Sequence, residues 1–416
     1  MRWLVQGVLG LILCHSMAYA SDQQQSFLVI SDMHVNTSMS HAMDFAPHRI
    51  TSLNDLDVTT YKKLIKELAL AIQLKTIARP KFIVLLGDMV GHYRVTMDAA
   101  LSSETIVFKT LKDAFPDTPI IYVFGNNDSF AGNYGPFQSL TYNGHAQSPK
   151  RVMSALWNTT GSLSTGKLCA LKSIHFPCVL NETPEHGYYA LYLAPKLRAL
   201  SLDSVMFSIH YKGEKKKAQN KQLQWLAEQL NSAHLNQESV LMFMHIPPGK
   251  NVYDDAWFGS HALFWDESIL QEFLSLIAKY HSDIIGVLSA HTHKDELKII
   301  RDPQGQPLVG VYLNAALSTS HGNAPSVRSY VLASSEEHWR LDNYFVYYFK
   351  KDKSEVISLQ LLYNYRDIYC SPLEPSINDC LGHVTVDTLE RYFSAGNKNY
   401  VEKFILPEHR YMTTYP

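Results

Sequence analysis

The sequence predicts an α/β fold, and two observations support this prediction. Apolar runs of β type alternate with amphipathic helical segments, which is the pattern of βαβ units around a parallel sheet. Five such runs end directly in Asp, Asn or His, and the carboxyl ends of sheet strands are where open α/β proteins keep their sites. The five stretches are Phe27–His34, Phe82–Asp88, Ile121–Asp128, Leu241–His245 and Ile284–His293.

Amphipathic helices are expected between these strands, because apolar residues recur at helical spacing on one face. Pro80 and Pro116 follow the first two helices, and proline does not continue a helix. A basic run at Lys215–Lys217 is interpreted as a solvated turn. The predicted helices are Tyr61–Ala78, Ser103–Phe115, Gln219–Leu235 and Ser268–Tyr280, and further strands are expected at Tyr188–Leu193, Leu197–Leu202, Leu297–Ile300 and Leu308–Leu313.

Two regions depart from this alternation. Residues 129–184 are rich in Gly, Ser, Thr and Asn, which predicts a long excursion over the site with one short helix at Val152–Trp157. After Ser335 the sequence predicts an aromatic strand at Asn343–Phe349, followed by helices at Val356–Tyr369 and Val386–Phe393. We therefore expect a main domain over residues 21–335 and a small helical C-terminal subdomain over residues 336–416.

The first twenty residues have the pattern of a secretory signal. Arg2 supplies the positive start, Val8–Cys14 the apolar core and Ala18–Ala20 a small-residue cleavage site. The apolar core is too short to span a bilayer, and no other stretch is long and apolar enough to do so. We expect residues 1–20 to be removed and the mature protein to be secreted or periplasmic.

If the protein is exported, its cysteines are expected to form disulfides. Without Cys14 the chain has Cys169, Cys178, Cys370 and Cys380, an even set in an oxidising compartment. Four cysteines allow three pairings, and we favour the local one, Cys169 with Cys178 and Cys370 with Cys380. Four free thiols are the alternative, which is less common outside the cytosol.

The bulk composition argues against some partners. The formal net charge is -2, so nothing indicates a nucleic-acid polymer or an anionic membrane as partner. The 416 residues and the 46% hydrophobic content are enough for one large core with a small appendage. The 19 histidines are more informative, because many lie beside Asp or Asn.

The polar residues at the strand ends are of the types that commonly bind metal ions in proteins. An isolated His or Gly-Asp at such a place is usually a surface residue or a turn, so the joint pattern carries the prediction. Seven ligands exceed what one tetrahedral ion uses, but two divalent ions that share a carboxylate need about this number. Carboxylate and imidazole without thiolate favour Zn, Fe or Mn. The seven candidates are Asp32, His34, Asp88, Asn126, His245, His291 and His293.

In their order along the chain, these motifs resemble the ligand set of the calcineurin-like metallophosphoesterases: Asp-x-His, Gly-Asp, Gly-Asn-x-Asp, His and His-x-His. Four other stretches look like the acid sphingomyelinase-like phosphodiesterase branch of that family. They are Lys221–Leu226, His245–Gly249, Ala290–Leu297 and Ala324–Tyr330. The resemblance covers nearly the whole mature chain.

The resemblance implies a four-layer α/β/β/α sandwich with two divalent metal ions, most simply Zn²⁺, at the sheet edges. It implies attack on phosphorus by a metal-bridging hydroxide while the cations neutralise phosphoryl charge. One ion is expected to bind Asp32, His34, Asp88 and His293, and the other Asp88, Asn126, His245 and His291, so that Asp88 bridges them.

Two residues concern proton transfer to the leaving group. His92 matches the family's histidine near the leaving group, and we expect it to be the general acid or a phosphate contact. Asn127 stands where the family has histidine, and a neutral amide donates a hydrogen bond but does not pass on a proton. The alternative to a full enzyme is therefore a protein that retains metal and binds phosphate compounds with little turnover.

The expected substrate is a small soluble phosphodiester. Lysosomal sphingomyelinase carries a lipid-extracting saposin domain before the catalytic domain, and this sequence shows none. Members without it favour nucleotide or choline phosphodiesters, so we rank these above sphingomyelin, whose hydrolysis would release phosphocholine. A lipid surface is the less favoured partner.

Overall fold

The computed structural model describes residues 23–45, 54–92, 96–137, 141–142, 145–146, 169, 176–182, 186–251, 263–335, 338–392, 395 and 412–414. The predicted signal segment and the helix expected at Val152–Trp157 lie outside these residues. Two large sheets organise the rest of the chain.

The first sheet has the strand order β17-β16-β15-β1-β4-β5. Its strands β1, β4 and β5 are parallel to one another, and β15 to β17 extend the sheet in antiparallel fashion from the edge of β1. Their bounds are β1 (Gln23–Ile30), β4 (Ile83–Leu85), β5 (Ile120–Tyr122), β15 (Ser326–Ser335), β16 (His338–Lys351) and β17 (Ile357–Asn364).

The second sheet has the order β18-β13-β14-β12-β11-β10-β9-β8, with a parallel centre of β10, β11, β12 and β14. Two short ribbons, β2 (Val35–Asn36) with β3 (Leu56–Asp57) and β6 (Thr141–Tyr142) with β7 (His145–Ala146), lie outside both sheets. The second sheet comprises β8 (Cys178–Glu182), β9 (Tyr189–Ala194), β10 (Leu197–Ser201), β11 (Ser239–Phe243), β12 (Ile284–Ser289), β13 (Glu296–Arg301), β14 (Pro307–Leu313) and β18 (Met412–Thr414).

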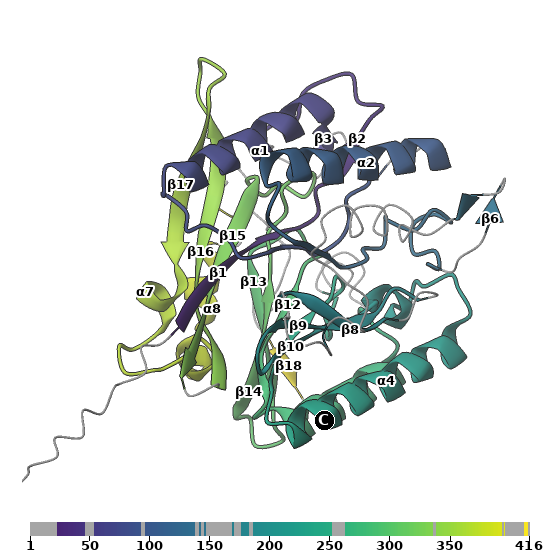
Figure 1. The fold of residues 1–416 in the computed structure, drawn as a ribbon, viewed down its shortest axis with the longest axis vertical. Helices are drawn as coiled ribbons and strands as arrows, with labels where there is room; N and C mark the ends of the chain where they lie inside the picture. Colours follow the sequence, from purple (N-terminus) through teal and green to yellow (C-terminus); the bar gives the residue numbers. More distant parts are fainter. Residues whose placement is uncertain are drawn as a thin grey trace, which may run out of the picture.

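The two sheets pack against each other and helices cover their outer faces. Successive side chains of a strand point to opposite faces. Phe27 and Val29 of β1 accordingly join Leu241 of β11 in the core between the sheets, whereas Leu28 packs on the helical side. Figure 1 shows α1 and α2 on one side of the strands and α4 on the other. The predicted α/β/β/α sandwich is confirmed, with helices α1 (Val58–Gln73), α2 (Met97–Ala114), α4 (Lys215–Leu235) and α6 (Glu267–Tyr280).

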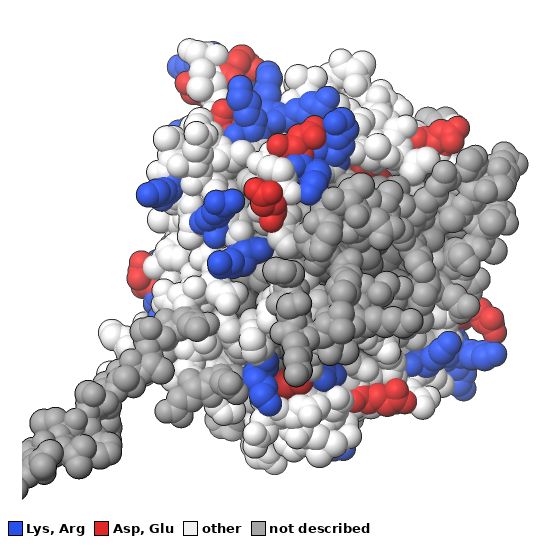
Figure 2. All heavy atoms as spheres, viewed as in Figure 1, with Lys and Arg blue, Asp and Glu red and all other residues white. Residues whose placement is uncertain are grey.

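Helix α1 shows how the pattern produces this layer. Leu64 and Leu68 are buried against the first sheet, while Lys62, Lys63 and Lys66 on the opposite face are exposed. Figure 2 shows Lys and Arg side chains gathered at the end of the molecule where α1 and the turn between β16 and β17 lie in Figure 1. These charges lie on the solvated outer face of the fold.

The basic run at Lys215–Lys217 does not form the predicted turn. It forms the first turn of α4 and not a loop, although Lys216 and Lys217 are exposed as expected. Lysine is a good helix former, so its propensity is compatible with a helical first turn here. The helix predicted to begin at Gln219 therefore begins four residues earlier.

The predicted helix Val356–Tyr369 is wrong over most of its length, because Ile357–Asn364 forms strand β17. Apolar and polar residues alternate from Ile357 to Leu361, and that period of two is the strand pattern. The predicted domain boundary after Ser335 falls between the paired strands β15 and β16, so residues 338–364 complete the first sheet. Only short helical elements follow: α7 (Tyr365–Tyr369), η3 (Asp379–His383) and α8 (Val386–Glu390).

Disulfides join Cys169 to Cys178 and Cys370 to Cys380, which confirms the local pairing. The second bridge ties α7 to η3 within the C-terminal region. Among the residues described, none of the helices has both the length and the apolar composition that a membrane span requires.

Asp57 caps α1, and its loss is expected to destabilise the fold. Its carboxylate accepts hydrogen bonds from the Thr60 N–H (2.9 Å) and the Met43 N–H (3.1 Å). We expect Asp57→Ala to lower the free energy of unfolding by about 1–2 kcal/mol in urea denaturation.

The same cap predicts a pH dependence. Burial opposes ionisation of Asp57, but the hydrogen bonds outweigh it and lower the pKa below the ordinary 3.8. The ionised cap thus stabilises the fold above that value, and this contribution is lost as pH falls through the lowered pKa. An equal unfolding free energy for Asp57→Ala and wild type at neutral pH would contradict the assignment.

Candidate metal centre

All seven predicted ligands lie at one rim formed by both sheets. Because β1, β4 and β5 run parallel, their carboxyl ends meet at one edge and present Asp32, His34, Asp88 and Asn126 there. The parallel strands β11 and β12 deliver His245, His291 and His293 from the second sheet. The site therefore lies where the carboxyl ends of the two sheets face each other.

The ligand atoms form two overlapping clusters. Those of Asp32, His34 and Asp88 lie within 4.8 Å of one another, as do those of Asp88, His245 and His291. Asp88 belongs to both, and its Oδ2 lies 3.5 Å from Nε2 of His34 and 3.5 Å from Nε2 of His245. Asp88 therefore lies between the two groups of candidate ligands.

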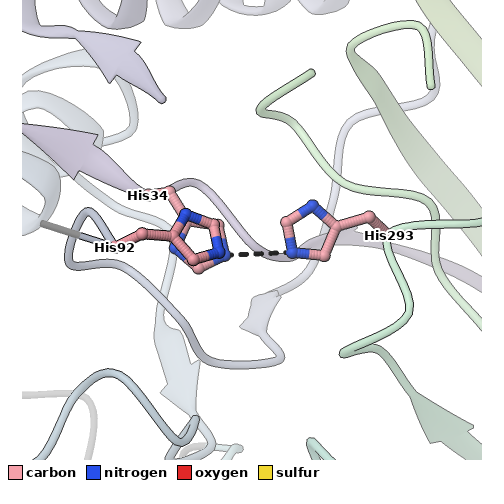
Figure 3. Close-up of side chains that lie close together, drawn as sticks. All are labelled: His34, His92 and His293. Atoms are coloured by element: carbon pink, nitrogen blue, oxygen red, sulfur yellow. Dashed lines mark hydrogen bonds between the residues drawn. The ribbon is translucent and has the colours of Figure 1, made fainter. Parts of the chain in front are cut away.

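The two remaining candidates complete the clusters. His293 Nε2 lies 3.6 Å from Asp32 Oδ1 and 3.0 Å from His34 Nε2. Figure 3 shows the His293 ring opposite that of His34. The Asn126 amide oxygen lies 3.1 Å from His245 Nε2, and Asn133 accepts a hydrogen bond from the amide nitrogen of Asn126, which orients that oxygen toward the site.

The donor set fits divalent cations. His34 and His245 each donate Nδ1–H to a backbone carbonyl, of Val90 (3.0 Å) and Leu86 (2.7 Å), so their Nε2 lone pairs face the cluster. Fixing the ring through the second nitrogen is how proteins prepare histidine ligands. Asp32 Oδ2 is buried and has no hydrogen-bond partner among the described residues. A buried carboxylate oxygen of this kind is costly unless a cation neutralises it.

The electrostatics are those of a desolvated site. Burial raises the pKa of the Asp32 carboxyl to about 7 and lowers the pKa of the His291 imidazole to about 3. Burial also opposes ionisation of Asp88 and His245, but their mutual attraction outweighs it. The pKa of Asp88 is lowered and that of His245 is raised to about 9. Carboxylates and imidazoles therefore depend on each other, or on a cation, for charge neutralisation.

The backbone at the site is strained. Five of the seven candidates adopt positive φ: Asp32 (45°), His34 (44°), Asp88 (53°), His291 (77°) and His293 (63°). Each such conformation costs on the order of 1–3 kcal/mol and persists only where the surroundings enforce it. Here hydrogen bonds between the loops enforce it, such as those from the Asp32 N–H to the Gly87 carbonyl and from the His34 N–H to the Asp88 carbonyl, both 3.0 Å.

Gly125, which lies shortly after β5, must be a glycine because its main chain approaches Asp88 closely. A Cβ atom at this position would lie 2.2 Å from both the main-chain nitrogen and Oδ1 of Asp88. The glycine thus lets the loop that carries Asn126 press against the shared carboxylate. This contact explains the Gly-Asn sequence after the strand.

Asp128 has a structural role that the sequence analysis did not assign. Its buried carboxylate accepts hydrogen bonds from the main-chain N–H groups of Asp88 (2.8 Å), Met89 (2.8 Å) and Gly125 (2.9 Å), and from the Tyr122 hydroxyl (2.6 Å). Burial raises the pKa of this carboxyl to about 6. Asp128 therefore ties the turn after β4, which carries Asp88, to the loop that follows β5.

His92 lies beside the first cluster. Its ring stacks on the ring of His34 with centroids 3.8 Å apart, and 25% of its side chain is exposed (Figure 3). Asp55 is 2.7 Å from His92 Nδ1. Burial alone would lower the pKa of His92, but Asp55 outweighs it and the pKa is raised.

Sequence reasoning missed two residues in this region, Asp55 and His321. The His321 ring lies 4.1 Å from that of His293, on the loop between β14 and β15. Neither residue belongs to a recognisable motif, and each reaches the site from a loop whose path only the tertiary structure reveals.

Asn127 contacts the shared carboxylate directly. Its main-chain N–H donates to Asp88 Oδ1 and its side-chain amide donates to Asp88 Oδ2, each at 2.8 Å. The side chain is buried. Asn127 therefore contacts Asp88, the candidate bridging ligand.

Aromatic rings border the second cluster. The ring centroids of Tyr134 and Phe264 lie 6.3 Å and 5.5 Å from that of His291. Tyr134 is partly exposed beside this cluster, whereas Phe264 is buried.

Comparison with known proteins identifies the family of this chain. A family model described as calcineurin-like phosphoesterase matches residues 26–295, and the chain belongs to that family. Acid sphingomyelinase-like phosphodiesterase 3b of Mus musculus is 25% identical over 263 residues, covering 60% of this chain and 50% of that protein. Cyclic GMP-AMP phosphodiesterase SMPDL3A of Mus musculus is 26% identical over 267 residues, covering 59% and 52%.

The chain thus spans about half the length of these curated relatives. Among solved structures, a dimetal phosphatase from Danio rerio matches with a TM-score of 0.46 and 16% identity, covering 77% of this chain and 95% of that one.

Proposed function

We propose that this protein is a secreted phosphodiesterase that uses two divalent metal ions to hydrolyse small soluble phosphodiesters. The observation that carries the proposal is the pair of Asp/His clusters joined by Asp88. The family match and the relatives named as phosphodiesterases support the same reaction. Zn²⁺ suits this set of imidazole and carboxylate ligands, with Fe or Mn as alternatives.

The division of ligands follows the two clusters. Asp32, His34 and His293 would hold one ion with Asp88, and Asn126, His245 and His291 the other with Asp88. The chemistry that such ions supply is an activated water and neutralisation of phosphoryl charge. The protein's own contribution is to hold these side chains in a fixed, desolvated geometry, through the carbonyls of Val90 and Leu86 and the carboxylate of Asp128.

His92 is proposed to protonate the leaving oxygen. Its Nδ1 is engaged by Asp55, so Nε2 is the atom left to face the site. We expect His92→Asn to lower kcat by about 10²–10⁴-fold for a nucleoside or choline leaving group, which needs a proton. The loss is expected to be much smaller for p-nitrophenol, a leaving group that needs none. Equal losses on both substrates would indicate a phosphate contact in place of an acid.

The substrate class is tested by a panel assay on metal-loaded protein. The substrates are bis(p-nitrophenyl) phosphate, a dinucleotide, glycerophosphocholine and detergent-dispersed sphingomyelin. We expect turnover of soluble diesters to exceed that of sphingomyelin. Faster release of phosphocholine from sphingomyelin would replace this proposal with a sphingomyelin phosphodiesterase. Secretion is tested separately by N-terminal sequencing of the exported protein, which is expected to begin at Ser21.

A second candidate function is a metal-retaining protein that binds phosphate compounds with little turnover. Asn127 favours it, because its amide occupies a position next to Asp88 without offering a transferable proton. If Asn127 limits turnover, Asn127→His is expected to raise kcat on a nucleoside diester by about tenfold or more. Asn127→Gln, which keeps an amide, is the matched control. An unchanged rate in Asn127→His would show that this position does not limit proton transfer.

A further inference from the structure

We propose that Asp55 is the positioning residue of His92, an inference that rests on the proposed role of His92 in phosphodiester hydrolysis. Asp55 is fully buried, and both of its carboxylate oxygens face the segment that carries His92. Oδ1 accepts from His92 Nδ1 at 2.7 Å, and Oδ2 accepts from the His92 main-chain N–H at 2.9 Å. One carboxylate thus holds both the ring and the backbone of the same residue.

This two-point contact determines the tautomer of His92. A carboxylate only accepts hydrogen bonds, so the ring hydrogen lies on Nδ1. The ring is further confined by stacking on His34, at a centroid distance of 3.8 Å. Figure 3 shows both rings lying together opposite His293, and the ring nitrogens of His34, His92 and His293 include atoms within 4.8 Å of one another. Asp55 therefore directs Nε2 of His92 toward the place where the phosphoryl group would be bound.

Neighbouring residues hold Asp55 in position for its contact with His92. Strand β3, which begins at Leu56, pairs with β2 next to His34, and the Leu56 N–H donates to the His34 carbonyl at 3.1 Å. Asn36 donates from its side-chain amide to Asp55 Oδ2 at 3.3 Å. At Gly91 an added Cβ would lie 2.9 Å from Asp55 Oδ2 and 2.7 Å from the Asn36 Cβ. The absence of a side chain at Gly91 lets the carboxylate reach His92.

A capping role does not account for Asp55. The cap of α1 is Asp57, two residues further on, whose carboxylate accepts from Thr60 and Met43. Among the described residues, the Asp55 carboxylate accepts hydrogen bonds from His92 and Asn36. Two buried carboxylates so close in sequence therefore have separate partners, and Asp57→Asn is a matched control for Asp55→Asn.

The test is a double-mutant cycle on the full chain loaded with zinc. Asparagine keeps the shape of aspartate but offers a single acceptor atom, so either the ring or the main chain of His92 loses its partner. On a nucleoside diester we expect Asp55→Asn to lower kcat by about 10–100-fold with little change in KM, as for other supporting residues. In the His92→Asn background the same substitution is expected to have no further effect, because Asp55 acts through His92.

The control Asp57→Asn is expected to lower the thermal midpoint without this loss of kcat. Additive losses in the double variant, or an unchanged kcat in Asp55→Asn, would overturn the inference. A loss of bound zinc in Asp55→Asn would also overturn it, because the defect would then belong to the metal centre.

A spectroscopic readout is independent of turnover. In zinc-loaded protein with ¹⁵N-labelled histidine, the signals absent from His92→Asn identify His92. At a pH at which the His92 ring is neutral, we expect the Nδ1–H tautomer in wild type and in Asp57→Asn, and its loss in Asp55→Asn. The proton donated to the leaving oxygen is the one that Nε2 carries in the imidazolium form, in which both ring nitrogens bear hydrogen. An Nε2–H tautomer in wild type would overturn the inference. Absence of hydrolysis by wild-type protein contradicts the proposed function alone, because the tautomer still reports whether Asp55 holds the ring.

Discussion

Asp88→Asn is expected to lower kcat by about 10³-fold or more and to reduce the zinc bound per chain. Asp88 is the one residue that belongs to both clusters, and its Oδ2 lies equally close to His34 and His245. Two bound cations contribute several kcal/mol of charge stabilisation to phosphoryl transfer, and about 1.36 kcal/mol corresponds to each tenfold in rate. An amide removes the negative charge that both ions would share. The measurements are kcat on bis(p-nitrophenyl) phosphate and zinc content by elemental analysis.

The control for this prediction is Asp57→Asn, a carboxylate with no ligand atom in either cluster. It is expected to retain both zinc and kcat. If Asp88→Asn kept the zinc content and kcat of wild type, Asp88 would not be a shared ligand and the division of the site into two metal positions would be wrong.

Asp128→Ala is expected to lower the free energy of unfolding by about 3–5 kcal/mol. The substitution leaves three buried main-chain N–H groups, of Asp88, Met89 and Gly125, without their acceptor. Each unsatisfied buried donor costs on the order of 1–3 kcal/mol, and loss of a buried charged partner costs similar amounts in other proteins. Urea denaturation of zinc-free protein measures this effect without the contribution of metal binding.

Tyr122→Phe provides the graded comparison. It removes only the hydroxyl that donates to Asp128 Oδ2 at 2.6 Å and leaves the main-chain hydrogen bonds intact. We expect a smaller loss, about 1.5–3 kcal/mol, for one hydrogen bond to a charged group. A larger effect for Tyr122→Phe than for Asp128→Ala would mean that the turn at Asp88 is held by something other than this carboxylate.

The parallel strands and the position of the candidate ligands at their carboxyl ends were predictable because their signals are local. An apolar run such as Phe82–Leu86 identifies a buried strand, and the polar residue directly after it must lie at the strand's carboxyl end. Parallel pairing of β1 with β4 then places Asp32 and Asp88 at one edge without further information. The four-layer arrangement came from the family resemblance and not from periodicity.

Other parts were not predictable because long-range contacts define them. Strand β17 differs from the predicted helix, because the alternation over Ile357–Leu361 is short and pairing with β16 decides the conformation. Asp55 and His321 reach the cluster from loops, where sequence spacing carries no distance information. Asp128 lies two residues from Asn126, yet sequence alone does not distinguish a ligand from the carboxylate that supports the turn.

The backbone conformation of the candidate ligands also depends on contacts between distant segments. Positive φ at Asp32, His34 and Asp88 is held by hydrogen bonds between loops that follow different strands. Those loops follow β1 and β4, which are distant in sequence and lie side by side in the first sheet. The sequence motif therefore indicates the candidate ligands, while the assembled fold gives them their geometry.

The central claim is that one rim holds two divalent ions through a shared Asp88. Elemental analysis of protein purified without added metal and without chelator tests it most directly, with Asp88→Asn and Asp57→Asn prepared in parallel. The account predicts about two divalent ions per chain in wild type and Asp57→Asn, and a clear deficit in Asp88→Asn. Wild-type protein that carries no metal, and acquires none on incubation with zinc, would contradict the account.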